Sequence, residues 1–524
     1  MYHLSVIITL LIIIILISFY VFYSDPPVFR GFRGFSELEY EPFDNFLIFN
    51  DLEVIENSNC QPFVVRPKQA DLLGLIAPEI FSCNSPMGHF ADFDVDSGTL
   101  TISDKLITKR LEGNDQNYTC VYTEIVKVGE HPVNGTLVSG AKEEFRIEPG
   151  NPTKIPLEQF VVYCRDPTGS HFYNKTFFNF KPKIEAKKHE NDKNQEDFDN
   201  LIVLSISGMS HNQAMRHLKG TLEFAAGNEF QSFSMFNQEP TNLGSGTSEM
   251  IWNVLKSQHN WTTFLQTDSR TFGEKYGSDF AFFPEFYNFY NQQHLAHVEN
   301  CISDGRVVIE DSVALWTNFS KIFSSENNFF ALLHFTEISK NSDGRLENLD
   351  EPLKNALKEL LENGILKNTT VVFMSEGGNF ETQISKTTES GYLESKYGLF
   401  MIRLSDNFRK KNPKKVEMFQ GNVDRLIIIE NIIETLKELV TLDHLEKVEK
   451  SLLSNRISAD TGCKEAGIDE KFCICSEIRI LNEETQKSIT ELLKKAIENE
   501  VSSQKCLEKV EISMDFPGKF RISG

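Results

Sequence analysis

Three stretches of this 524-residue chain place a polar side chain directly after an apolar run. "LIVLSIS" ends at Ser207, "TTVVFMSE" ends at Glu376, and "LLHFTE" contains His334 and Glu337. Short apolar runs are typical of parallel strands that are buried on both faces. In open α/β sheets, function gathers at the carboxyl ends of the strands. We therefore expect these side chains at one sheet edge, where carboxylates and an imidazole could bind a metal or transfer protons.

The elements around these runs indicate an α/β fold. "YGLFMIRL", residues 397–404, predicts a further parallel strand, and "DEPLKNALKELLENG", residues 350–364, has apolar residues at helical spacing. Asp350 could cap the start of that helix, and Gly364 could end it. A second helix is expected within 423–442. Helices that alternate with apolar strands predict a parallel sheet flanked by helices.

The composition divides the chain into five regions. Residues 1–23 form a signal anchor or transmembrane helix, and residues 24–180, with β-branched and aromatic runs broken by Gly, Pro and Asn, predict a mostly β accessory domain. Residues 181–200 form a charged linker, 201–445 the α/β domain, and 446–524 a cysteine-containing C-terminal region. A chain of this length is expected to contain two or three domains.

The net charge of the chain indicates which kinds of partner it can bind. The chain has 53 basic and 75 acidic residues, a formal net charge of −22. Such a surface repels polyanions, so nucleic acid is not expected as a partner. The 40% apolar content and 43 phenylalanines are ample for buried cores.

The N-terminal segment predicts the compartment. Residues 4–23 carry no charge, and a helix of that length spans about 30 Å, the thickness of a bilayer core. Bulky residues follow, where a cleaved signal peptide would have small ones, so an uncleaved anchor is favoured over cleavage. We expect a single-pass membrane protein of the secretory pathway or cell surface, with its body lumenal or extracellular.

Cysteines and sequons fit that compartment. The disulfide candidates lie in the first third and in the last 62 residues, and their pairing is left open: Cys60, Cys83, Cys120, Cys164, Cys463, Cys473, Cys475 and Cys506. Scattered buried thiols are the alternative. The glycosylation candidates are Asn117, Asn134, Asn174, Asn260, Asn318 and Asn368.

These features together resemble a known family. The strand–helix order, the "SEGG" turn after "LENGILKNTTVVFM", the following "SGYLESKYGLFMIRL" and the C-terminal "GCKEAGIDEKFCIC" are similar to the domain-of-unknown-function 229 family, which is abundant in nematodes. The resemblance covers roughly residues 50–480. It implies an alkaline phosphatase/sulfatase-like core, whose active members use one or two metal ions and an oxygen nucleophile at phosphorus or sulfur.

The family's site residues are degenerate in this chain. Where the first strand of the family ends in a metal-binding Asp, this chain has Ser207, and the nucleophile position aligns with Leu243. The Asp-His pair that ends the later strand is replaced by Glu376 and Gly377. The resemblance therefore implies a metal site that has lost its ligands, with no catalytic residue and no metal or other cofactor expected.

Three functions remain in competition. The favoured one is a catalytically inactive, membrane-anchored or secreted glycoprotein that binds a protein or glycan ligand. The first alternative is a diverged phosphoester or sulfate-ester hydrolase that would need zinc, calcium or magnesium. Its fallback residues are Thr241, Ser245, His334 and Glu337, with Glu376, although hydroxyls before a helix are more often caps. The second alternative is a structural ectodomain.

Overall fold

The structure is a computed structural model. It describes residues 60–476 except 63–66, 69–71, 73–74, 84–89, 111–117, 132–134, 184–198, 238, 240–249, 259–260, 299, 303–304, 326–327, 340–342, 377–379, 381 and 441–447, and also residue 491 and the hairpin β19 (Glu511–Asp515) and β20 (Lys519–Ser523). The chain forms two compact units, one of residues 33–475 and one of residues 1–32 with 476–524. The account below concerns the larger unit.

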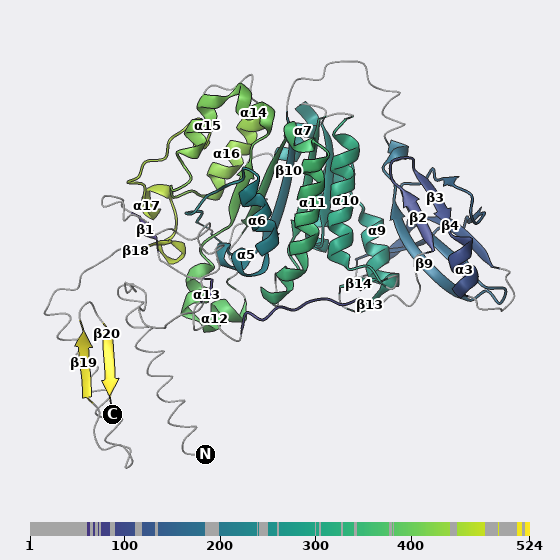
Figure 1. The fold of residues 1–524 in the computed structure, drawn as a ribbon, viewed down its shortest axis with the longest axis horizontal. Helices are drawn as coiled ribbons and strands as arrows, with labels where there is room; N and C mark the ends of the chain where they lie inside the picture. Colours follow the sequence, from purple (N-terminus) through teal and green to yellow (C-terminus); the bar gives the residue numbers. More distant parts are fainter. Residues whose placement is uncertain are drawn as a thin grey trace, which may run out of the picture. The chain divides into compact units, whose positions relative to one another are not determined.

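A six-stranded sheet organises this unit (Figure 1). In spatial order its strands are β11 (Gln231–Ser232), β17 (Phe400–Arg403), β16 (Thr369–Glu376), β10 (Asn200–Ser207), β15 (Phe329–Phe335) and β12 (Thr262–Thr267). The four strands from β16 to β12 are parallel, with β10 in their middle. This confirms the predicted α/β class and brings the carboxyl ends of β10, β15 and β16 to one edge.

Helices cover both faces of the sheet, and Figure 1 shows α10 and α11 over one of them. That face packs against α5 (His211–His217), α6 (Lys219–Gly227), α10 (Val308–Phe323) and α11 (Asp350–Glu362). The other face packs against α7 (Ile251–Gln258), α14 (Asp406–Lys411), α15 (Pro413–Gln420) and α16 (Ile429–Val440). Each layer buries a continuous apolar cluster, which is why the central strands are apolar on both faces.

Residues 397–404 were expected to be a parallel strand, and this expectation was wrong. β17 pairs with β16 in the antiparallel direction, with Phe373 opposite Met401. Between the two strands, the described residues form α12 (Gln383–Thr387) and α13 (Glu389–Glu394), and the chain re-enters the sheet from the edge at which it left. A parallel partner would need a crossover along the whole length of the sheet.

The ends of α11 were predicted in part. Gly364 follows the helix with φ of 72°, a left-handed conformation that glycine adopts without strain, so the predicted stop is confirmed. Asp350 does not cap its own helix. Its carboxylate accepts hydrogen bonds from the backbone amides of Gly220 and Thr221, in the first turn of α6, at 2.8 and 2.7 Å. The expected cap therefore serves a neighbouring helix.

Residues 90–183 contain the predicted β-rich region. One sheet contains β2 (Ala91–Asp94), β3 (Thr99–Ile102) and β7 (Thr153–Lys154). The other contains β5 (Gly135–Gly140), β4 (Thr119–His131), β8 (Gln159–Arg165) and β9 (His171–Phe178), with β6 (Phe145–Ile147) paired to β4. A shared core and the Cys120–Cys164 disulfide hold this β domain together.

The β domain also packs into the α/β core. Phe180, which follows β9 and is 1% exposed, has its ring 5.7 to 5.9 Å from those of Phe264, Phe282 and Phe319. A polar contact lies nearby, since Thr176 donates a 2.6 Å hydrogen bond to the side chain of Asn291. The β domain and the α/β domain therefore share part of one buried interior.

Disulfides link distant parts of the chain. Cys60 pairs with Cys475 and Cys83 pairs with Cys301, at sequence separations of 415 and 218, while Cys463–Cys473 closes a short loop beside α17 (Cys463–Ala466). Cys506 and the predicted membrane segment lie outside the described residues. Within the part of the chain that is described, no helix has the length and apolar character needed to cross a bilayer.

Replacing Phe180 should test whether the two domains unfold together. Phe180→Ala should lower the free energy of unfolding by about 3–5 kcal/mol, because it leaves a cavity among the aromatic rings that surround it. Trp252, Trp261 and Trp316 all lie in the α/β domain, so urea denaturation followed by tryptophan fluorescence reports the effect there. The exposed Phe145→Ala is the control, with a loss below about 1 kcal/mol. An unchanged tryptophan transition in Phe180→Ala would show that the domains unfold separately.

Candidate functional site

One face of the sheet changes from apolar to polar at its carboxyl edge. Side chains alternate between the two faces along a strand, so Leu201, Val203, Ser205 and Ser207 of β10 share a face. The first two are packed against α7 and α16, whereas the last two are hydroxyl residues. Three further polar residues join Ser205 on this face, and together we call them the edge cluster: Ser205, Thr267, His334 and Glu376.

Glu376 is the charged centre of the edge cluster. One oxygen, Oε1, accepts a 2.9 Å hydrogen bond from the hydroxyl of Ser205 and lies 2.6 Å from Nε2 of His334. The side chains of Glu376 and His334 are only 2% and 3% exposed. A carboxylate removed from water to this degree needs such partners, because an unpaired buried charge costs several kcal/mol.

The other side of the imidazole is also occupied. Nδ1 of His334 lies 3.1 Å from the hydroxyl of Thr267, and that hydroxyl accepts a hydrogen bond from the backbone amide of Ser269. The ring of Phe272, from α8 (Arg270–Tyr276), stacks on the imidazole with centroids 4.0 Å apart. These contacts fix the orientation of the imidazole between Thr267 and Glu376.

Asp268, next to Thr267, is half-buried, and its carboxylate is hydrogen-bonded to the backbone. Its carboxylate accepts hydrogen bonds from the amides of Thr336, Glu337 and Ile338 at 2.6, 2.9 and 3.2 Å. Burial raises the pKa of Asp268, while these bonds and the nearby His334 lower it, and burial is the larger effect. Asp268 therefore anchors the loop after β15.

Two buried basic groups, His211 and Lys396, lie in segments that are hydrogen-bonded to each other. The backbone amide of His211, at the start of α5, donates to the carbonyl of Tyr397. Burial lowers the pKa of His211 to about 4, so its ring is neutral at neutral pH. Burial also lowers the pKa of Lys396 to about 8. Desolvation thus disfavours positive charge on both groups.

The structure brings together some of the predicted residues and separates others. His334 and Glu376 meet, whereas Glu337 is exposed and outside the cluster. Ser207 lies opposite Glu376 in the β10–β16 register, and its carbonyl accepts a hydrogen bond from the hydroxyl of Ser339. The remaining site predictions, Thr241, Leu243, Ser245 and Gly377, lie outside the described residues.

Sequence reasoning missed Ser205, Thr267 and Asp268. Ser205 lies two residues before Ser207, so strand alternation alone places both hydroxyls on one face. Thr267 ends β12 and Asp268 follows it, and the run "TTFLQT" was not recognised as a strand. The signal that could have found them is the one that found His334, namely a polar residue at the end of an apolar run.

The sequons divide by exposure. Asn368, before β16, is exposed, while Asn174 in β9 and Asn318 in α10 are half-buried. The other three predicted sites lie outside the described residues. Asn368 is therefore the described sequon that has most room for a glycan.

The described residues do not fit a two-cation centre. Such a centre needs several carboxylate or imidazole ligands around open space. Here Glu376 is paired with His334 and Ser205, Asp268 is bonded to three amides, and Ser207 offers only a neutral hydroxyl. In the described part of the chain, the group of three or more potential ligands that comes closest together is Cys463, Cys473 and Cys475, which are in disulfides.

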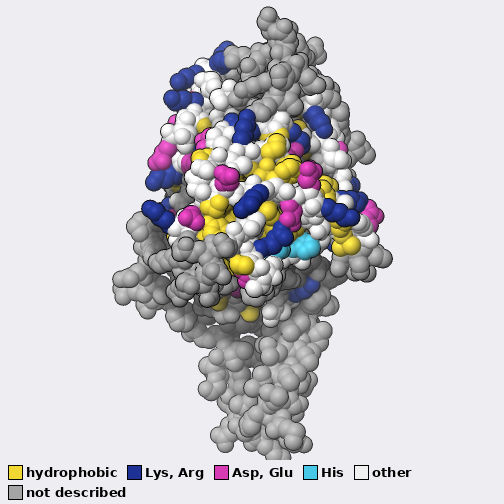
Figure 2. Space-filling view, turned by 90° about the vertical axis from the view of Figure 1, so that its right-hand side faces the viewer, with side chains coloured by type: hydrophobic (Ala, Val, Ile, Leu, Met, Phe, Trp, Pro, Cys, Tyr) yellow, Lys and Arg dark blue, Asp and Glu magenta, His cyan; other side chains and the backbone are white. Residues whose placement is uncertain are grey.

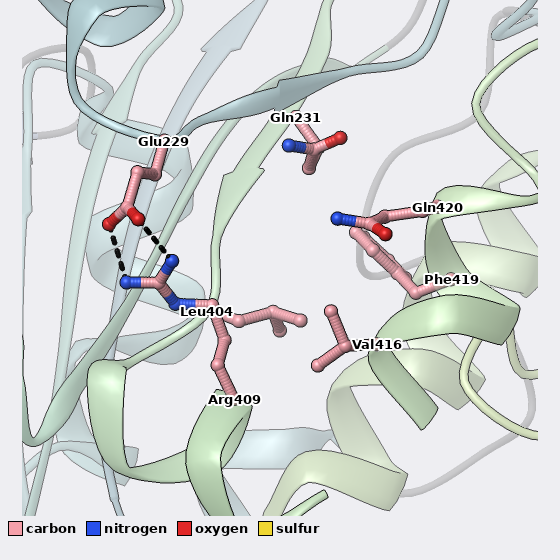
Figure 3. Close-up of a pocket in the computed structure, with 7 residues that line it drawn as sticks. All are labelled: Glu229, Gln231, Leu404, Arg409, Val416, Phe419 and Gln420. Atoms are coloured by element: carbon pink, nitrogen blue, oxygen red, sulfur yellow. Dashed lines mark hydrogen bonds and ion pairs between the residues drawn. The ribbon is translucent and has the colours of Figure 1, made fainter. Parts of the chain in front are cut away.

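A small cavity lies near the amino ends of the parallel strands, whereas the edge cluster lies at their carboxyl ends (Figure 3). It has a volume of about 170 Å³ and is lined by Glu229, Gln231, Leu404, Arg409, Val416, Phe419 and Gln420. Arg409 pairs with both oxygens of Glu229, as the dashed lines show. Leu404 follows β17 where that antiparallel strand reaches the amino ends of the parallel strands. The cavity is therefore separate from the edge cluster.

A family comparison now identifies the class of the chain. The model of the family described as "Protein of unknown function (DUF229)" matches residues 82–242 and 249–510. The chain belongs to this family, which confirms the resemblance found in its sequence. A comparison with curated proteins found no significant match.

Solved structures of several different proteins are similar to this chain. The C-terminal periplasmic domain of EcEptC from Escherichia coli has a TM-score of 0.36 and 12% sequence identity, covering 52% of this chain and 90% of that one. The lipoteichoic acid synthase LtaP from Listeria monocytogenes has a TM-score of 0.30 and 12% identity, covering 51% and 79%. The PsFucS1 sulfatase from Pseudoalteromonas sp. has a TM-score of 0.24 and 12% identity, covering 37% and 57%. The α/β assignment of this chain rests on its own strand order and register.

A double-mutant cycle should measure the pairing inside the edge cluster. His334→Leu and Glu376→Leu should each cost about 3–5 kcal/mol of stability, because each leaves a buried polar partner unpaired. The double variant should cost less than the sum by at least about 1 kcal/mol. As the control, His334→Leu combined with the exposed Glu337→Leu should be additive. Additivity in both cycles, measured by urea denaturation, would contradict the buried pair.

Proposed function

We propose that this chain is a non-hydrolytic member of the alkaline phosphatase/sulfatase-like superfamily that acts by binding a protein or glycan ligand. The single observation that supports the proposal is that the carboxylate of Glu376 already has partners within its own sheet. This carboxylate, at the strand end where the resemblance implies a metal ligand, contacts His334 and accepts a hydrogen bond from Ser205 instead. A cation at this place would have to displace both of these contacts from Glu376.

The β domain supports a binding role for another part of the surface. Residues 90–183 carry 11 basic and 13 acidic side chains, so this region contributes little to the net charge of −22. Three of its large apolar side chains are exposed: Leu106, Val128 and Phe145. Figure 2 shows this side of the molecule, where apolar patches lie among lysines and arginines. A near-neutral face with aromatic and apolar groups suits a protein or glycan partner.

The edge cluster also favours a second candidate function. Thr267, His334 and Glu376 place a hydroxyl, an imidazole and a carboxylate in line, which is the order that activates a nucleophile in hydrolases. Two features weigh against it. Thr267 is only 7% exposed, and its hydroxyl already accepts a hydrogen bond from the amide of Ser269. A diverged ester hydrolase is therefore the alternative that any activity assay must address.

Metal content and turnover should separate these functions. The purified body of the protein should contain no stoichiometric zinc, calcium or magnesium and should not hydrolyse aryl phosphates, sulfates or carboxylic esters. The variants Glu376→Gln and Thr267→Val and the exposed control Glu337→Gln should have the same metal content as the wild type and, like it, no hydrolytic activity. Near-stoichiometric metal with turnover reduced about a hundredfold in Glu376→Gln would establish the metal-dependent hydrolase. Metal-free turnover that is lost in Thr267→Val would establish the hydroxyl–imidazole–carboxylate hydrolase.

The membrane anchor and the glycans belong to the same proposal. The uncharged segment at residues 4–23 and the disulfides between distant parts of the chain support a single-pass protein with an extracellular or lumenal body. In sealed microsomes, the body should be protected from added protease and should lose mass on deglycosylation. Asn368→Gln should remove one glycan, because this sequon is exposed. Complete digestion without detergent would place the body on the cytosolic side instead.

A further inference from the structure

Four half-cystines meet beside α17 in the C-terminal part of the larger unit. We call them the sulfur cluster: Cys60, Cys463, Cys473 and Cys475. Two disulfides join them, Cys60–Cys475 and Cys463–Cys473. The sulfur of Cys463 lies 3.3 Å from that of Cys475, its neighbour in the other disulfide. The two disulfides are therefore in contact through Cys463 and Cys475.

The members of the cluster differ in exposure. Cys60 and Cys463 are 4% and 9% exposed, whereas Cys473 and Cys475 are half-buried. Apolar side chains that include Met235 surround the cluster. A thiolate from solvent thus reaches Cys473 more readily than Cys463, and a thiolate formed on Cys463 would be shielded from solvent and face Cys475.

We propose that the sulfur cluster is a thiol–disulfide exchange site whose substrate is an external small-molecule or protein thiol. The external thiolate attacks the sulfur of Cys473, and the new bond is a mixed disulfide. The Cys463–Cys473 bond breaks, and its electron pair leaves on Cys463 as a thiolate. This thiolate then attacks Cys475, the Cys60–Cys475 bond breaks, and Cys60 leaves as a thiolate that takes a proton from water.

The atoms and electrons of this sequence balance without an oxidant. One thiol and two disulfides give a mixed disulfide on Cys473, a new Cys463–Cys475 disulfide and a free thiol on Cys60. The loop beside α17 remains cross-linked, because Cys475 replaces Cys473 as the partner of Cys463. The link that is released is the one with the 415-residue separation. Exchange at Cys473 thus removes the disulfide that holds Cys60, and the next disulfide along the chain is the one at Cys83.

Two matched variants test the contact between the disulfides. Cys473→Ser and Cys463→Ser remove the same disulfide. The remaining thiol is on Cys463 in the first variant and on Cys473 in the second. In Cys473→Ser, the thiol on Cys463 faces Cys475, so Cys463–Cys475 should form and Cys60 should be free. In Cys463→Ser, the thiol remains on Cys473, and a disulfide to Cys475, two residues along the chain, would be strained. Cys60–Cys475 should therefore persist in that variant.

The readout is alkylation without prior reduction, followed by peptide mass mapping of protein from the secretory route. Cys60 should be alkylated about tenfold more in Cys473→Ser than in Cys463→Ser. Equal alkylation of Cys60 in the two variants would overturn the proposal.

The wild-type protein supplies a second test that needs no substitution. It is treated with one equivalent of reduced glutathione, quenched in acid and mapped. The first product should carry glutathione on Cys473, a Cys463–Cys475 disulfide and a thiol on Cys60. A first product with free thiols on Cys463 and Cys473 and an intact Cys60–Cys475 disulfide would show that the two disulfides react independently, which overturns the proposal.

Discussion

The 2.6 Å contact between the carboxylate of Glu376 and the imidazole of His334 is the constraint on which the candidate site depends. The two side chains come from strands on either side of β10, and both are almost fully buried. A carboxylate at this depth must be neutralised. In this chain, an imidazole from the same sheet lies within hydrogen-bond distance of it, and Ser205 supplies a further hydrogen bond. The polar end of one sheet face is thus satisfied by hydrogen bonds between its own strands.

The surrounding strands and helices position His334 and Glu376. Parallel pairing of β15, β10 and β16 puts the two residues at the same edge, and α8 places Phe272 on the imidazole. Asp268 fixes the loop after β15 through three backbone amides. The β domain adds Phe180 to the aromatic core behind the opposite face. These contacts fix the positions of both side chains within the sheet.

Local patterns in the sequence were sufficient to predict some features of the fold and insufficient to predict others. Apolar runs located β10 and β16, and helical spacing with a terminal Gly364 located α11. The direction of β17 could not be predicted from its own residues, because direction depends on where the connecting chain crosses. Asp350 shows the same limit, since its carboxylate caps a helix 130 residues earlier. The pairing of Cys60 with Cys475 likewise depends on the completed fold, because spacing alone allows many pairings.

X-ray diffraction at the zinc absorption edge, from crystals grown in the presence of zinc, tests the central claim most directly. The account predicts that Oε1 of Glu376 remains within hydrogen-bond distance of Nε2 of His334 and that no anomalous peak lies within bonding distance of either atom. A zinc ion bound to Glu376, with His334 turned away or acting as a second ligand at about 2.0–2.2 Å, would contradict it. That result would show that the imidazole occupies the place of the metal only in its absence.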